Sequence, residues 1–305
     1  MSGPVRDWTH SSACWTVHNR MHHLRLFLRD IRIEHTLFGL PFAYVGAVMG
    51  ARGLPTLAQM FWITIAVAGA RTAAMAANRY FDRKIDAQNP RTMKRPTASG
   101  ALPPSVMATA IVAGLLVTLI AAWQLNPLCV VLFPLAALAL LVYPLCKRFT
   151  WGSHFLLGAV DGFAPLGAFV AVTGTITFPA VLLFVAVTIW VAGFDILYAL
   201  MDYDVDVAQN LRSVPVRFGV RASRVLPIVL HVLMVLSLWS AGILSSATSI
   251  YFVGVLLAVL LVVYESRLIA LASNIFALND RVLVTNMAFS VGFLATTVVA
   301  YVAKR

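Results

Sequence analysis

Long apolar runs constrain this chain more than any other feature. Of its 305 residues, 60% are hydrophobic and only 11% are charged, which is more apolar side chain than one soluble core needs. The runs approach the length that an α-helix needs to cross a bilayer, and strand-like alternation is absent. The sequence therefore predicts an all-α membrane protein with about nine transmembrane helices. The expected spans are residues 34–51, 57–78, 105–123, 127–145, 154–172, 178–201, 227–246, 249–265 and 283–302.

Basic residues predict the orientation of these helices. With the N-terminus inside, the cytoplasmic segments contain most of the 23 lysines and arginines, whereas the opposite side holds only Arg52, Lys304 and Arg305. Such an excess is typical of cytoplasmic loops. The same asymmetry explains most of the net charge of +11, so the charge gives little support to nucleic-acid binding.

The start of the chain differs from the rest. Residues 1–20 are polar and lack the apolar segment of a signal peptide, so we expect a tail followed by one membrane domain over residues 21–305. Apolar residues at helical spacing then predict an amphipathic helix on the cytoplasmic membrane surface. Its apolar face is Leu24, Phe27, Leu28 and Ile31, and its basic face is Arg25, Arg29 and Arg32. Because Arg32 lies where this helix meets the first span, it is also a candidate substrate-binding residue.

Two acidic clusters with the same spacing end two of the spans. In each cluster a polar residue is followed by aspartates four and eight positions later, which places the three on one face of a regular helix. Carboxylates stacked in this way repel each other, and Mg²⁺ would offset that repulsion because it binds carboxylates together with substrate phosphates. Asp204 points away and is expected to be solvated. The clusters are Asn78, Asp82 and Asp86, and Tyr198, Asp202 and Asp206.

The clusters also indicate an internal repeat. The second and the sixth expected spans each run into one cluster, which predicts two related four-helix halves plus a ninth helix. Each cluster precedes a basic, proline-containing segment, residues 89–96 and 212–217. Carboxylates with cations nearby suit a diphosphate held by Mg²⁺, while an apolar bundle accommodates a hydrocarbon tail. The expected substrate is a lipid with a diphosphate head.

A transporter or a lipid-binding protein is the alternative class. Such proteins also place carboxylates and a residue such as Arg71 inside a helical bundle. They concentrate those groups near the middle of the membrane, whereas the acidic residues here gather at one face. We therefore favour an enzyme.

These motifs resemble the UbiA superfamily of intramembrane prenyltransferases. The resemblance covers about residues 24–300 and rests on both acidic clusters and on the segment Tyr143-Pro-Leu-Cys-Lys147-Arg148. It implies nine helices around a central cavity, and Mg²⁺-dependent transfer of a prenyl chain from an isoprenyl diphosphate to an aromatic acceptor. It also implies that Tyr143, Lys147 and Arg148 bind phosphate oxygens near the bond that breaks. Two Mg²⁺ and the diphosphate would be held by Asn78, Asp82, Asp86, Asp202 and Asp206.

Further polar residues have two interpretations each. Arg71 lies inside a span and either binds the diphosphate or forms a structural ion pair. Asp195 either orients or deprotonates the acceptor phenol or is a structural, neutral acid. His35 and His154 could contact an acceptor carboxylate, although a lone histidine near a helix end is more often structural. Asp161, in the middle of a span, has no role that the sequence assigns.

The acceptor stays open between two classes. Residues 32–43 and 194–198 resemble the branch that contains both 4-hydroxybenzoate enzymes and the futalosine-pathway prenyltransferase. We favour 4-hydroxybenzoate, in ubiquinone synthesis, over prenylation or decarboxylative prenylation of a naphthoate in menaquinone synthesis. The expected location is a bacterial inner membrane, with the active site at the cytoplasmic face and no obligate protein partner.

Overall fold

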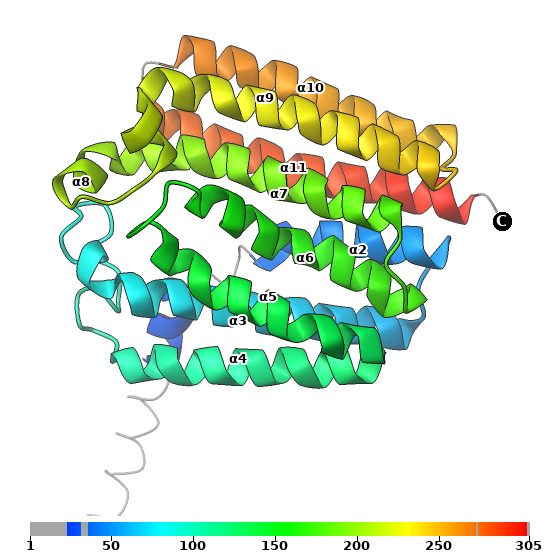
Figure 1. The fold of residues 1–305 in the computed structure, drawn as a ribbon, viewed down its shortest axis with the longest axis horizontal. Helices are drawn as coiled ribbons and strands as arrows, with labels where there is room; N and C mark the ends of the chain where they lie inside the picture. The colour runs from blue at the N-terminus through cyan, green and yellow to red at the C-terminus, as the bar shows by residue number, and fades with distance from the viewer. Residues whose placement is uncertain (1–22, 32–35, 273, 304–305) are drawn as a thin grey trace, which may run out of the picture.

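The computed structural model describes residues 23–31, 36–272 and 274–303, and every regular element in these ranges is helical. Figure 1 shows the helices running alternately in opposite directions along one bundle, with α8 at the end where α3 finishes. The tail over residues 1–20, Arg32 and His35 lie outside the described residues. The helices are α2 (Thr36–Ala51), α3 (Leu57–Asp86), α4 (Pro104–Leu125), α5 (Pro127–Cys146), α6 (Ser153–Thr173), α7 (Phe178–Ala199), η2 (Leu200–Asp202), α8 (Tyr203–Ala208), α9 (Val214–Leu244), α10 (Ser249–Leu271) and α11 (Ile275–Val302).

The span prediction is confirmed in its main features. In the described part of the chain, eight helices are long and apolar enough to cross a membrane, and the segment Gly39–Ala51 of α2 is a shorter apolar helix. Two helices extend beyond the apolar runs: α3 continues to Asp86, and α9 begins at Val214, with a non-helical break at Gly219 (φ 82°, ψ 169°). Hydropathy misses these ends because many of their side chains are hydrophilic.

The second acidic cluster corrects one expectation. We expected Tyr198, Asp202 and Asp206 to share one regular helix, but α7 ends at Ala199 and tightens into the 3₁₀ turn η2 before α8 begins. The backbone of Asp202 has φ −106° and ψ 6°, outside the α-helical region. A 3₁₀ turn has three residues per turn, so the four-residue spacing no longer aligns the side chains.

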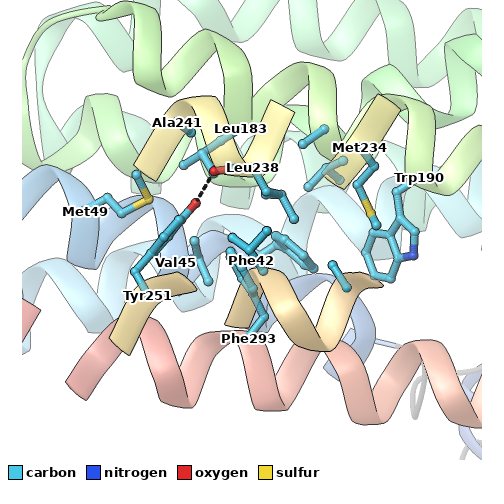
Figure 2. Packing of buried hydrophobic residues seen from close by; sticks show 14 of the residues in the cluster. Phe42, Val45, Met49, Leu183, Trp190, Met234, Leu238, Ala241, Tyr251 and Phe293 are labelled. Atoms are coloured by element: carbon cyan, nitrogen blue, oxygen red, sulfur yellow. Dashed lines mark hydrogen bonds between the residues drawn. The ribbon is translucent and has the colours of Figure 1, made fainter. Parts of the chain in front are cut away.

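The two halves pack in corresponding ways. α3 packs against α4 in the first half, and α7 packs against α9 in the second. α11 contacts both α2 and α10 and so joins the ends of the chain. The largest core joins α2 to the helices of the second half. In it the Phe42 ring of α2 stacks on Phe293 at a centroid distance of 5.7 Å and contacts Trp190 at 4.9 Å (Figure 2).

A ring of buried polar groups holds Trp190 in this core. The Trp190 indole N–H donates to Asn286 Oδ1, and the Asn286 amide donates to Glu265 Oε1. Glu265 Oε2 lies 2.7 Å from His231 Nδ1, and His231 Nε2 donates back to the Trp190 carbonyl at 3.1 Å. All four side chains are almost fully buried. The ring therefore links α7, α9, α10 and α11 and fixes Trp190 at both its backbone and its indole.

The amphipathic helix at the start of the chain is present over residues 23–30. Its basic residues Arg25 and Arg29 are exposed, as expected. The following Ile31 is buried against Ala76 of α3 and Met107 of α4. The apolar face therefore packs against the protein at Phe27 and Ile31, whereas Leu24 is 53% exposed.

Candidate active site

A polar cavity of about 330 Å³ lies where the two halves meet. It is lined by both acidic clusters, by the ends of α5 and α6, by the loop after α3 and by one face of α11. Ten sequence-predicted residues line it: Arg71, Asn78, Asp82, Asp86, Tyr143, Lys147, Asp195, Tyr198, Asp202 and Asp206. The fold thus brings together side chains that are far apart in the sequence.

The first acidic cluster is buried and paired with cations. Lys147 Nζ, just after α5, lies 2.6 Å from Asp82 Oδ2, and Asn78 donates to the same oxygen at 3.2 Å. Arg148 does not line the cavity, but its Nη2 lies 3.4 Å from Asp82 Oδ1. Asp86 accepts a hydrogen bond of 2.8 Å from Arg95. Asp82 is therefore the point at which α3 and the end of α5 are joined.

The second cluster receives its cation from the other half of the chain. Arg91, in the loop after α3, donates from Nε to Asp202 Oδ1 at 2.8 Å and from Nη2 to Asp202 Oδ2. Its Nη1 donates to the Tyr198 hydroxyl, and Asn89 also donates to Asp202 Oδ1. Burial alone would lower the pKa of Arg91, but the hydrogen bonds and charge of Asp202, together with Tyr198, outweigh it and raise the pKa. Arg91 thus stays protonated.

Sequence reasoning did not select Asn89, Arg91 and Arg95 as site residues. The signal was present, because these three belong to the basic, proline-containing segment over residues 89–96. What the sequence did not reveal is that Arg91 crosses to the second cluster while Arg95 stays with the first. Asp204, expected to be solvated, is exposed.

A second, apolar cavity of about 190 Å³ adjoins the polar one. It is lined mainly by alanine and leucine side chains from α3, α4, α5 and α6. Arg71 and Asp161 line both cavities, so the two spaces meet at these residues. Arg71 Nε is buried without a hydrogen-bond partner, so this N–H of the guanidinium is available to donate to a ligand. The buried Tyr143 hydroxyl donates to the Ala74 carbonyl at 3.4 Å, between the cavities.

Asp195 on α7 has an unexpected partner, the buried His154 on α6. His154 Nδ1 lies 2.7 Å from Asp195 Oδ2, and His154 Nε2 accepts a hydrogen bond from the backbone N–H of Val214 at 3.3 Å. His154 therefore connects α6, α7 and the start of α9. Its expected contact with an acceptor carboxylate remains a prediction.

The carboxylate oxygens of the two clusters suit Mg²⁺ in kind, because Mg²⁺ prefers oxygen ligands. Within the described residues, no group of three or more His, Cys, Asp or Glu side chains is close enough to hold a metal ion by itself. Mg²⁺ usually binds through one or two carboxylates plus substrate phosphates, so a ready-made cage is not required. The arrangement fits a metal that binds together with a phosphorylated substrate.

Known proteins resemble this chain over most of its length. The UbiA prenyltransferase family matches residues 39–274. The 4-hydroxybenzoate octaprenyltransferase of Alkalilimnicola ehrlichii is 33% identical over 73% of this chain and 76% of its own length. That of Pseudoalteromonas translucida is 29% identical over 92% of this chain and 97% of its own length.

Solved structures share the fold. The apo structure of a UbiA homolog from Aeropyrum pernix K1 has a TM-score of 0.79 and 32% identity, and covers 88% of this chain and 98% of that one. A UbiA homolog from Archaeoglobus fulgidus bound to GPP and Mg²⁺ has a TM-score of 0.69 and 18% identity, covering 89% of this chain and 99% of that one.

The helical bundle is that of a multi-pass integral membrane protein. The chain belongs to the UbiA prenyltransferase family. It is an aromatic prenyltransferase, which confirms the enzyme prediction and leaves the transporter or lipid-binding alternative without support.

Proposed function

We propose that this enzyme transfers a polyprenyl chain from an isoprenyl diphosphate to 4-hydroxybenzoate, with Mg²⁺, in quinone biosynthesis. The observation that carries the proposal is the junction of two cavities, one lined by paired aspartates and cations and the other almost wholly apolar. A diphosphate fits the chemistry of the first and a prenyl tail that of the second. The named relatives support 4-hydroxybenzoate as the acceptor.

The cations of the polar cavity bind the diphosphate. Arg91, Arg95 and Lys147 each contact an aspartate in the structure, and each can exchange that contact for a phosphate oxygen. Asp82, Asp86, Asp202 and Asp206 would then hold Mg²⁺, whose bound charge helps neutralise the departing diphosphate. Asn78, Tyr198 and Arg148 keep these groups in position through their contacts.

In the reaction the C–O bond between the prenyl carbon and the diphosphate breaks, and a ring carbon beside the phenol oxygen forms the new C–C bond. The C–H bond at that ring carbon then breaks, its proton leaves with the diphosphate, and the phenol oxygen regains its own proton. Arg71, with its free Nε donor at the junction of the cavities, and Tyr143 lie where the bond breaks. The apolar helices exclude water, which would otherwise capture the allylic cation.

Asp195 activates the acceptor. It lines the polar cavity, and its side chain is 27% exposed. As a carboxylate it accepts the phenol proton, which raises the electron density of the ring and makes the neighbouring carbon a better nucleophile.

The site opens toward the cytoplasm in this proposal. The polar cavity lies at the end of the bundle that carries the loops after α3 and α5, and these loops contain clustered arginines and lysines. Such residues concentrate on the cytoplasmic side. The bacterial relatives support the inner membrane as the location.

Turnover in detergent tests the function. The purified protein is incubated with geranyl diphosphate, Mg²⁺ and equal amounts of 4-hydroxybenzoate and 1,4-dihydroxy-6-naphthoate, and products are identified by mass spectrometry. We expect prenylated 4-hydroxybenzoate, and none with EDTA. A prenylated naphthoate alone would replace the acceptor by the menaquinone-type alternative. If neither product forms with short or long prenyl diphosphates, both acceptor assignments are wrong.

A further inference from the structure

We propose that His154 is a positioning residue that holds Asp195 as an oriented carboxylate for removal of the acceptor's phenol proton. This inference rests on the proposed function. It starts from a contact that the sequence did not predict, the 2.7 Å distance between His154 Nδ1 and Asp195 Oδ2.

The hydrogen bonds of His154 determine which nitrogen carries the proton. The backbone N–H of Val214 can only donate, so His154 Nε2, 3.3 Å away, must accept and is unprotonated. A neutral imidazole then carries its proton on Nδ1, which donates to Asp195 Oδ2. Asp195 Oδ2 therefore accepts this hydrogen bond, as it does in the ionised carboxylate that the proposal requires of a base.

The hydrogen bond from Val214 also opposes a second proton on the imidazole. That proton, on His154 Nε2, would replace the acceptor of the Val214 N–H by a donor and break the hydrogen bond.

Close packing of α6 on α7 makes the contact possible. Gly158 lies one turn after His154, and a Cβ there would stand 2.0 Å from the Thr188 carbonyl oxygen. The two backbones touch at this point, which brings the start of α6 within reach of Asp195. His154 itself is only 4% exposed, so its orientation is fixed by packing.

Asp195 keeps one oxygen for the substrate. Its hydrogen bond to His154 uses Oδ2, and among the described residues no hydrogen bond to Oδ1 is present. In the proposed step the phenol O–H bond breaks, the proton moves to Asp195 Oδ1, and the acceptor becomes a phenolate. No other reactant is needed for this step.

Substitutions of His154 separate positioning from structure. His154→Phe removes both hydrogen bonds. His154→Gln keeps an amide group near the Val214 N–H, whereas His154→Asn places an amide N–H near the Nδ1 position. We expect the phenylalanine and glutamine variants to lower kcat about 100-fold, the lower end of what general base catalysis contributes, with the KM for prenyl diphosphate little changed. His154→Asn should retain activity within about fivefold of wild type, because the donor to Asp195 is restored.

A more acidic acceptor gives a second readout. With 3-fluoro-4-hydroxybenzoate, which keeps one free carbon beside a more acidic phenol, the defect of His154→Phe should shrink at least about tenfold because less base strength is required. Equal loss in the asparagine and phenylalanine variants without such rescue would show a structural role and overturn the proposal. So would wild-type kcat in His154→Phe or His154→Gln. A wild-type enzyme that prenylates neither acceptor would instead overturn the proposed function.

Discussion

The two acidic clusters have one spacing in the sequence but two structures. Asp82 and Asp86 lie on a continuous helix, α3, and both are buried. Asp202 and Asp206 lie on η2 and α8, beyond a break in the helix, and both are partly exposed. The first cluster is thus part of a rigid helix, whereas the second depends on a short irregular segment (Figure 1).

Their cations differ in the same way. Asp82 is paired with Lys147 and Arg148 at the end of α5, within the same half of the chain. Asp202 is paired with Arg91, which comes from the loop of the first half. The repeat is therefore incomplete, because the loop after α3 supplies a cation to both clusters, Arg95 to Asp86 and Arg91 to Asp202.

The largest expected effect comes from neutralising one aspartate in each cluster. Asp82→Asn and Asp202→Asn should each lower kcat about 1,000-fold, since each removes a charge that binds the metal and diphosphate. Both variants should also lower the Tm, because each leaves a partly buried cation without its counterion, Lys147 in one and Arg91 in the other. Steady-state kinetics and detergent-solubilised thermal unfolding measure the two effects. Near-wild-type turnover in both variants would remove the metal assignment.

Lys147→Ala should have the next largest effect, a loss in kcat of about 100-fold. The lysine contacts Asp82 and can bind a phosphate oxygen. Its removal therefore weakens binding of the diphosphate and also the stabilisation of the negative charge that develops on the leaving group. Exposed Lys84→Ala, on the last turn of α3, is the matched control and should leave turnover unchanged. Turnover of Lys147→Ala close to that of the control would assign Lys147 to anchoring alone.

The sequence predicted the helices within each half of the molecule better than the contacts between the two halves. Apolar runs located the spans because membrane helices need continuous apolar surface, and the spacing of Asn78, Asp82 and Asp86 placed them correctly on α3. The 3₁₀ turn at Asp202 was not predictable, since nothing in Leu200-Met201-Asp202 forbids an α-helix. That choice depends on tertiary contacts.

The same limit applies to partners distant in the chain. Asp195 was selected from its spacing, whereas its contact with His154 needs the close approach of α6 and α7. Arg91 and Arg95 have the same chemistry and lie in the same loop, yet they bind different clusters. Local sequence gives the type of side chain, and only the packed bundle decides which carboxylate it meets.

Substituting lysine for Arg91 and for Arg95 tests how each cluster depends on the shape of its cation. Arg91→Lys should lower kcat/KM for prenyl diphosphate about tenfold, because a lysine cannot reproduce the two-pronged contact with Asp202. Arg95→Lys should lower it less than about threefold, since Arg95 makes a single hydrogen bond to Asp86 that an ammonium can replace. Equal effects would show that the loop acts only through its charge.

The smallest expected effect is at Asp204, which lies between the two aspartates of the second cluster. Asp204→Asn removes the same charge as Asp202→Asn, only two residues away, from a side chain that is exposed. Because exposed charges are screened by water and salt, kcat should change less than about twofold. A loss close to that of Asp202→Asn would mean that α8 reorganises when substrate binds and turns Asp204 toward the cavity. The break after α7 would then be present only in the free enzyme.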